Sequence, residues 1–225
     1  MIWGKKSLVL LLFSAPAPLL FTACGSHWDD LNVVRAESDP VHIHRMGGDI
    51  EVKDAPHGAD LETMGGNIRL DHVESFAKLH SMGGNITVEQ ADGSVVAETM
   101  GGEIRIASAY GPIKASTMGG NITARLAGAS NNQRDIKLSS KGGTIRLTVP
   151  KDFPMDVRIT LAYTRSSSQD FRIEENLGLK QRISSDWESN FGSPRKFIRA
   201  EGRVGNGQNL VTIDTINGDV IVRAE

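Results

Sequence analysis

One phrase, Met-Gly-Gly-x-Ile, returns at a constant spacing in the first half of the chain. Its five clean copies begin at Met46, Met64, Met82, Met100 and Met118, and they hold five of the chain's seven methionines. A relaxed copy follows at 141–145 and a last one at 216–220. A fixed period of this length is the signature of a solenoid, in which each repeat forms one coil and buries its apolar face against its neighbours.

Alternation within each repeat predicts two short strands per coil. One aliphatic column stands four positions after each Met and another two positions further on, as in Ile86 and Val88, with Thr87 between them. Two more apolar columns precede the Met, and turns fall at the Gly-Gly pairs and near 57–58, 92–93 and 111–112. Period-two alternation marks strands with one buried face, and stacked coils would pair each strand in parallel with its copy. We therefore predict an all-β fold, a single-domain parallel β-solenoid with 18-residue coils over residues 41–163.

The turn residues have physical roles in this scheme. Glycine allows a tight bend through positive φ or close approach of two backbones. Asn67, Asn85 and Asn121 follow the glycines, and we expect them to stack as an amide ladder or to hydrogen-bond the turn backbone. Two interpretations of the Met column are open. We favour a flexible filler at a corner of the core, and the other is a stripe that binds a metal or an apolar partner.

The period breaks towards the C-terminus. An insertion around 128–133 predicts a loop, after which Ile136 and Leu138 resume the columns. Residues 164–209, here called the cap segment, are non-repeating and richer in charged and aromatic residues, as expected of an insertion that covers open strand edges. Within it, 177–187 fits either a short amphipathic helix or a pair of edge strands. The closing strands, 210–225, match half a coil.

The first part of the chain, 1–24, has the pattern of a secretory signal. Two lysines precede an apolar stretch, and the two prolines inside that stretch argue against a permanent transmembrane helix. Residues 20–24 resemble a bacterial lipoprotein cleavage box, with Phe21 in place of the usual small aliphatic residue. The resemblance implies that Cys24 is lipidated and anchors the protein. The other interpretation is an ordinary signal that leaves a free thiol. As the only cysteine, Cys24 has no partner for an intramolecular disulfide.

Residues 25–40 are polar and predict a short tether, with a first strand over 31–35. Gly25 follows the cysteine where some inner-membrane lipoproteins carry Asp, which favours the outer membrane. The expected location is therefore the cell envelope, with a lipid anchor in the membrane.

Three features together resemble a known family. They are the Gly-Gly or Gly-Asp-Ile turns, a Val-Pro-x-x-Phe-Pro break at 149–154 and the closing Thr-Ile-Asn-Gly-Asp-Val-Ile-Val at 215–222. This pattern is similar to a bacterial adhesin-like family of unknown function, which is related to the auto-transporter-adhesin-head type of β-solenoid. The resemblance covers roughly 40–225. It implies the solenoid fold and an adhesive role, and it supplies no catalytic motif.

The net charge and the motif content argue against a nucleic-acid partner and against several classes of enzyme. The net charge is −2, and no basic run is longer than two residues after residue 6, which argues against a nucleic-acid partner. The chain contains no phosphate-binding loop, zinc-protease or serine-hydrolase motif, so we expect no cofactor and no catalytic residue. The predicted function is a non-catalytic envelope lipoprotein with a scaffolding or binding role. The alternative is a carbohydrate-active β-helix enzyme, a lyase or hydrolase, which needs clustered carboxylates beside the cap segment.

Two sets of surface residues are candidates for binding. His44, Glu62, His80 and Glu98 form an outward column, which we expect to be a solvated charge ladder. His44 and His80 are two rungs apart, roughly 9.6 Å, so no metal site is expected.

Aromatic and Arg residues dominate binding hot spots, which makes the cap segment the candidate partner surface. The residues are Trp187, Phe191, Arg195 and Phe197. The competing interpretation is that these aromatics cover the open end of the solenoid. Besides the membrane, an envelope protein or a polysaccharide is the expected partner.

Overall fold

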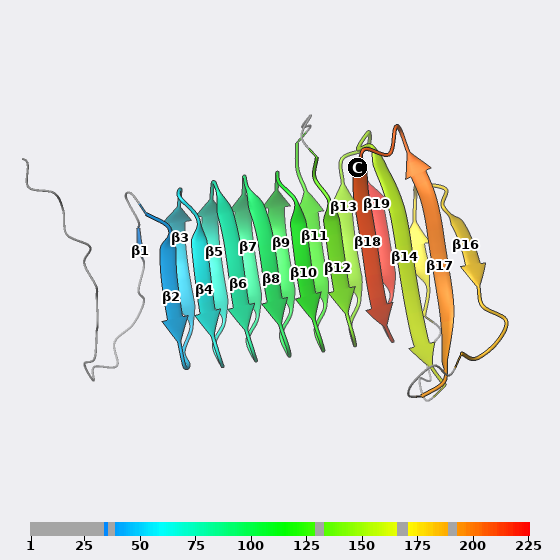
Figure 1. Cartoon of the computed structure of the whole chain (residues 1–225), viewed down its shortest axis with the longest axis horizontal. Helices are drawn as coiled ribbons and strands as arrows, with labels where there is room; N and C mark the ends of the chain where they lie inside the picture. The colour runs from blue at the N-terminus through cyan, green and yellow to red at the C-terminus, as the bar shows by residue number, and fades with distance from the viewer. Residues whose placement is uncertain (1–33, 36–38, 129–132, 166–170, 189–192) are drawn as a thin grey trace, which may run out of the picture. The chain divides into compact units, whose positions relative to one another are not determined.

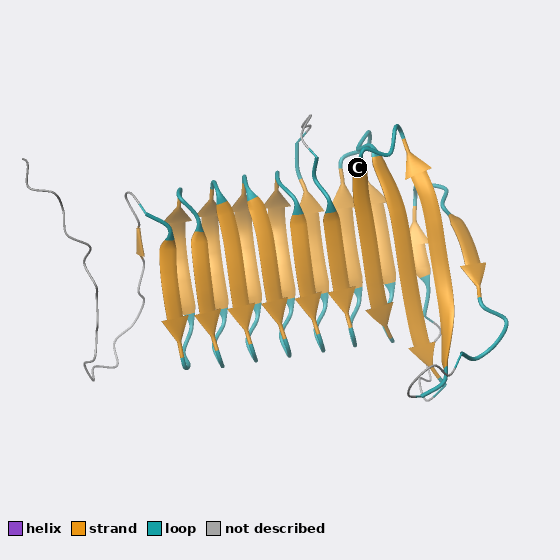
Figure 2. Ribbon diagram, viewed as in Figure 1, coloured by secondary structure: helices purple, strands orange, loops and turns teal. Residues whose placement is uncertain are grey.

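The computed structural model describes residues 34–35, 39–128, 133–165, 171–188 and 193–225. The predictions for the signal segment, Cys24 and Phe191 lie outside these residues. Residues 31–225 form one compact unit. Its described part is all-β, with a nine-stranded and a ten-stranded sheet whose strands are mostly parallel (Figures 1 and 2). The predicted parallel β-solenoid is confirmed. No helix in the described residues is long and apolar enough to cross a membrane.

The two sheets face each other, and each coil gives one strand to each sheet. Sheet A contains, in spatial order, β1 (Val34–Arg35), β3 (Ile50–Ala55), β5 (Ile68–Val73), β7 (Ile86–Ala91), β9 (Ile104–Ala109), β11 (Ile122–Leu126), β13 (Ile145–Val149), β19 (Val220–Ala224) and β15 (Ile173–Glu175). Sheet B contains β16 (Lys180–Ile183), β17 (Arg195–Val204), β14 (Met155–Thr164), β18 (Asn209–Ile216), β12 (Ile136–Ser140), β10 (Ile113–Thr117), β8 (Ser94–Thr99), β6 (Phe76–Ser81), β4 (Ala59–Thr63) and β2 (Val41–Arg45).

The predicted aliphatic columns form the core between the sheets. Ile68, Ile86 and Ile104 pair with one another in register and are almost fully buried, whereas Thr87 between the columns is half-buried on the outer face. The alternation predicted from the sequence is therefore assigned to the correct faces.

Close backbone contact explains the second glycine of each pair except the first, where Gly48 has open space around it and a left-handed backbone with a φ of 84°. A Cβ atom on Gly84 would overlap the carbonyl of Gly66 in the preceding coil, and the same overlap recurs at Gly66, Gly102, Gly120 and Gly143. The first glycine is less confined, since a Cβ atom on Gly83 would meet nothing nearer than 3.8 Å.

A column of buried hydroxyl groups supports these turns. Its members directly precede the turn in each coil and are Thr63, Ser81, Thr99, Thr117, Ser140 and Thr215. Thr99 is typical: its Oγ1 donates to the carbonyl oxygen of Gly84 at 2.9 Å and accepts the N–H of Gly102 at 3.3 Å. The first five hydroxyls thus satisfy backbone groups of two successive coils, and that of Thr215 donates to the carbonyl oxygen of Gly143.

The asparagines follow the second of their two expected roles. The side-chain oxygen of Asn67 accepts the backbone N–H of Asn85 at 2.9 Å, and that of Asn85 accepts the N–H of Glu103 at 2.8 Å. The amide side chains therefore join each turn to the turn of the next coil.

The methionines of the five repeats do not fill the core. Met64, Met82, Met100 and Met118 are 42–47% exposed, and Met46 is 83% exposed. The favoured interpretation of the Met column as a core filler is therefore wrong. The physical reason is the strand alternation, because Met64, Met82, Met100 and Met118 each follow a buried hydroxyl residue and so point outward.

The C-terminal strands form a whole coil, not half of one, and this coil is out of chain order. Strand β18 lies between β12 and β14 in sheet B, and β19 lies between β13 and β15 in sheet A. After β13 the chain therefore skips one position, which the end of the chain, 209–225, returns to fill. Figure 1 shows β18 and β19 seated among strands that precede them in sequence.

A buried arginine, Arg134, hydrogen-bonds to this inserted coil. The backbone N–H of Arg134 donates to Asn209 Oδ1 at 2.6 Å, while its guanidinium donates to the carbonyl oxygens of Ala127 and Gly128. The guanidinium carbon also lies 4.9 Å from the ring centroid of Phe153. Burial lowers the pKa of Arg134.

The cap segment contains strands in its described residues and no helix. Strand β17 pairs antiparallel with β14, and β16 pairs antiparallel with β17 at the edge of sheet B. Residues 177–187 allowed a short helix or a pair of edge strands, and the structure has a single edge strand there, over Lys180–Ile183.

Candidate functional site

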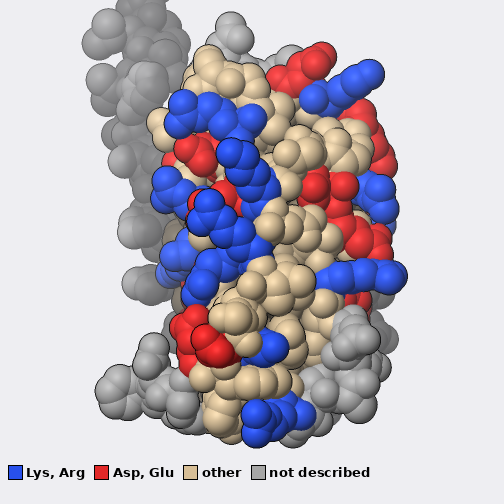
Figure 3. Space-filling view, turned by 90° about the vertical axis from the view of Figure 1, so that its right-hand side faces the viewer, with Lys and Arg blue, Asp and Glu red and all other residues tan. Residues whose placement is uncertain are grey.

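The outer face of strands β16 and β17 is strongly basic. Ile198 and Ala200 on β17 are buried, so Arg199, which alternates with them, points outward. Arg182 on β16 stands directly opposite Arg199 in the antiparallel ladder. Figure 3 looks at this end of the unit and shows Lys and Arg side chains gathered along one side.

The pairing of two arginines leaves positive charge uncompensated. Like charges directly opposite each other destabilise a sheet. Arg199 has only a long ion pair, in which its Nη2 lies 3.9 Å from Glu188 Oε1, and Arg182 has no ion pair within the described part of the chain. An anionic ligand would relieve this repulsion.

A hollow of about 400 Å³, here called the cap hollow, lies over these side chains. Its lining is Lys180, Arg182, Ile183, Ser184, Ser185, Arg199 and Glu201. It therefore combines three cationic side chains with one carboxylate. Guanidinium groups bind carboxylates and phosphates through two parallel hydrogen bonds, so the hollow suits an anionic group.

Two of the predicted partner residues lie beside the cap hollow. Phe197 is two residues before Arg199 on the outward side of β17, and the Arg199 guanidinium carbon lies 4.7 Å from its ring centroid. Arg195 is two residues before Phe197 and forms an antiparallel bridge with Glu188. Both residues lie on the same outward side of β17 as Arg199, and Arg195 adds a positive charge to it.

Trp187 lies on the opposite side of the same strands. Its ring packs edge-on against Tyr163 at 5.9 Å and lies under the ammonium group of Lys196 at 5.6 Å. Tyr163 and Lys196 alternate with the outward residues of β14 and β17, so Trp187 sits on the core side. The predicted residues therefore do not form one patch, and the sequence pattern does not single out Lys180 and Arg199 of the cap hollow. The signal that could have found them is the hairpin register, which the sequence does not display.

Carboxylates around the cap are engaged in structural contacts. Asp156 pairs with Arg203 at 3.3 Å, and Glu174 pairs with Arg172 at 2.6 Å. The Glu175 carboxylate accepts backbone N–H groups of residues 177–179. Among the described residues, the cap hollow thus contains only one carboxylate, that of Glu201.

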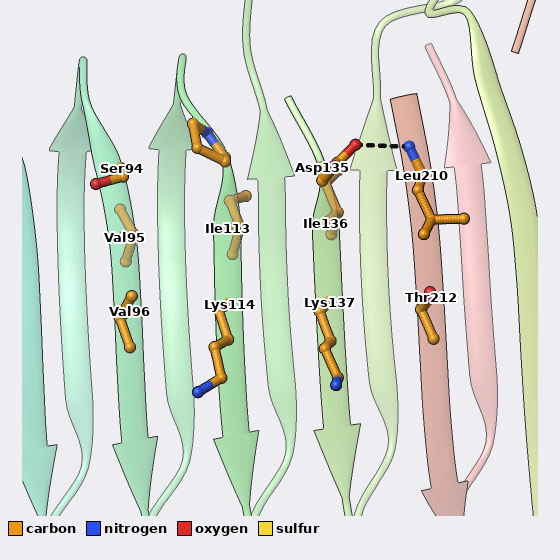
Figure 4. A pocket seen from close by; sticks show the side chains of 11 residues that line it. Ser94, Val95, Val96, Ile113, Lys114, Asp135, Ile136, Lys137, Leu210 and Thr212 are labelled. Atoms are coloured by element: carbon orange, nitrogen blue, oxygen red, sulfur yellow. Dashed lines mark hydrogen bonds between the residues drawn. The ribbon is translucent and has the colours of Figure 1, made fainter. Parts of the chain in front are cut away.

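A second hollow, of about 390 Å³, lies on the flank of sheet B across β8, β10, β12 and β18 (Figure 4). Val96, Pro112 and Leu210 give it an apolar floor, and Lys114 and Lys137 stand side by side at the same level. Its one carboxylate, Asp135, accepts the backbone N–H of Leu210 at 2.8 Å. This hollow includes the place where the inserted coil joins the repeats, since Leu210 and Thr212 of β18 are in its lining.

The outward column makes exposed polar contacts between neighbouring strands. His44 Nδ1 lies 2.9 Å from Glu62 Oε2, and Lys114 Nζ lies 2.7 Å from Glu98 Oε1, a contact that lowers the Glu98 pKa. On sheet A, His72 lies between Asp54 and Asp92. Within the described ranges, no group of three or more His, Cys, Asp and Glu side chains has the geometry to hold a metal ion.

Comparison of the chain with protein-family models, with curated protein sequences and with solved structures gives no match in any of the three.

Proposed function

We propose that this chain is a secreted, lipid-anchored protein of the cell envelope that binds an acidic polysaccharide without catalysis. The β-solenoid serves as a rigid frame, the cap hollow is the binding site, and Cys24 carries the anchor in the outer membrane. The adhesin-like character inferred from the repeat pattern belongs to the same proposal.

The observation that carries the proposal is the opposed pair of Arg182 and Arg199. Evolution of a stable frame alone would favour a neutral or oppositely charged pair at this position. Two guanidinium forks with Lys180 beside them match the carboxylates of a uronic-acid polymer. Ser185, whose hydroxyl donates to Asp186 Oδ2, keeps an acceptor for a sugar hydroxyl.

The distribution of carboxylates supports binding over glycoside hydrolysis. Hydrolysis of glycosides uses two carboxyl groups that flank the scissile bond, about 5 to 9.5 Å apart. Each of the two hollows has a single carboxylate in its lining, Glu201 in one and Asp135 in the other.

The binding site can be tested with polygalacturonate as the probe and uncharged dextran as the reference. The double variant Arg182→Gln, Arg199→Gln should lose binding by about tenfold or more, because each charge-assisted hydrogen bond contributes roughly 1.5–3 kcal/mol. A matched control is Arg105→Gln, Arg146→Gln, which removes the same charge from the outer face of sheet A. Equal losses in the two doubles would indicate general charge attraction, and no binding of polygalacturonate by the wild type would refute the ligand class.

The anchor is tested separately by Cys24→Ser in cells. We expect the variant to leave the membrane fraction, because the acyl chains on this residue are proposed to hold the protein there. A variant that stays with the membranes and resists a salt wash would refute the lipoprotein part of the proposal and leave the cap hollow untouched.

A further inference from the structure

Five methionines that the fold does not bury stand in one line along the solenoid. They are Met46, Met64, Met82, Met100 and Met118, here called the methionine ladder. The four later members are exposed by 44%, 42%, 45% and 47%, so their surroundings are nearly identical. Met155, by contrast, is 1% exposed in the core. The ladder is thus a repeated surface feature that core packing does not explain.

The strand register fixes the spacing of the ladder. The residues directly before the methionines, Thr63, Ser81 and Thr99, are paired with one another across β4, β6 and β8. The backbone N–H of Met82 donates to the carbonyl of Thr63 at 3.2 Å, so the pairing continues into the turn. Neighbouring strands lie about 4.8 Å apart, and one thioether is therefore presented at each such step.

This spacing matches the reach of a soft metal ion. A metal–sulfur bond of about 2.3 Å gives a sulfur–metal–sulfur span of about 4.6 Å. Thioethers are neutral, soft ligands that select Cu(I), whereas Mg²⁺ and Ca²⁺ require oxygen ligands. We propose that adjacent methionines of the ladder bind a soft monovalent cation of the Cu(I) and Ag(I) class between their sulfur atoms.

The surrounding side chains favour cation binding at the middle of the methionine ladder. Glu62, His80 and Glu98 lie two residues before Met64, Met82 and Met100 on the same outward face. The Glu62 carboxylate makes the local potential more negative, whereas the charge of Glu98 is offset by Lys114, and the imidazole is a further ligand type that copper accepts. Lys141 occupies the methionine position of the next coil, and its positive charge disfavours a cation at that end.

The test compares two double variants with equal numbers of methionines. Met64→Leu, Met100→Leu leaves Met46, Met82 and Met118, no two of which are adjacent. Met46→Leu, Met64→Leu leaves the adjacent run Met82, Met100 and Met118. Leucine keeps the apolar surface and volume, so only the sulfur atoms are removed. Every protein is the full chain and carries Cys24→Ser, which removes the competing thiol.

Ag⁺ in chloride-free buffer is the probe, with titration calorimetry and the methionine methyl NMR signals as readouts. We expect the parent to bind Ag⁺ with shifts of the ladder methyl signals. The variant without adjacent methionines should bind at least about tenfold more weakly, whereas the variant with the adjacent run should stay close to the parent. Equal affinity of the two doubles, or Ag⁺ binding that leaves the methyl signals unchanged, would overturn the proposal. The thermal midpoints of all variants should agree, because the substituted side chains are exposed.

Discussion

At the scale of single residues, the two glycines of each turn have different roles. A Cβ atom on Gly84 would overlap the Gly66 carbonyl, whereas one on Gly83 would have only ordinary contacts. Gly84→Ala should therefore lower the free energy of unfolding by roughly 1–3 kcal/mol or more, because the stacked backbones must separate. Gly83→Ala should change it by no more than about 0.5 kcal/mol. Denaturant melts of the two variants make the comparison, and equal losses would show that the close approach does not control the turn.

His72 is the residue whose contribution depends most clearly on pH. Its Nδ1 lies 2.8 Å from Asp54 Oδ1 and its Nε2 lies 3.4 Å from Asp92 Oδ2. The hydrogen bond to Asp54 is the main reason that the His72 pKa is raised from 6.5, with a smaller opposing effect of burial and a further rise from Asp92. A raised folded-state pKa means that the contact stabilises the protein below the unfolded pKa, and that this stability is lost as pH rises through the folded value.

The substitution His72→Gln should therefore destabilise the protein more at about pH 5.5 than at about pH 8.5. The difference should stay within about 1 kcal/mol, because the pair is partly exposed. Asp54→Asn removes the main cause of the shift and should reduce the same pH dependence. Denaturant midpoints at the two pH values provide the measurement, and a loss that does not change with pH would contradict the assignment.

At the scale of elements, the sequence predicts what depends on period and alternation. The columns through Ile86 and Val88 are buried as predicted, because period-two alternation alone determines which face of a strand is apolar. The exposure of Met82 was missed for a related reason. Chemistry alone predicts that a hydrophobic residue at a turn packs in the core, although the buried neighbour Ser81 is the residue that faces inward.

The hydroxyl column and the cap hollow are features that the sequence pattern does not predict. In the sequence Thr99 looks like an ordinary polar residue. Its role in the turn is visible only in the structure, where its hydroxyl donates to the Gly84 carbonyl of the preceding coil. Arg182 and Arg199 lie on separate strands of a segment without repeats, and only the antiparallel register brings them together. Pairings across non-repeating segments depend on the path of the chain, which no local pattern records.

At the scale of the whole described unit, the last two strands return to a position between earlier strands. The repeat register of Val211 and Ile213 identifies their column correctly but does not say which rung they occupy. In the structure the inserted coil joins the repeats to the cap, since β18 lies between β14 and the repeat strand β12 in sheet B. The contacts of Arg134 with Asn209 strengthen the same junction. The closing segment 209–225 is therefore an internal support of the fold, although it ends the sequence.

Deleting residues 209–225 should accordingly disconnect the cap. The deletion removes four buried aliphatic side chains, Val211, Ile213, Val220 and Val222, which contribute roughly 6–12 kcal/mol together. That amount is comparable with the whole stability of a typical domain. We expect the amides of β14 and β17 to lose protection in hydrogen exchange while the coils of β4 to β9 keep theirs, because each coil of a solenoid depends on its nearest neighbours. Deleting the first coil, residues 41–58, is the matched control and should leave the β14 and β17 amides protected. If those amides stayed protected after the C-terminal deletion, the cap would have docked directly on β12, and the inserted coil would not be the support that its position indicates.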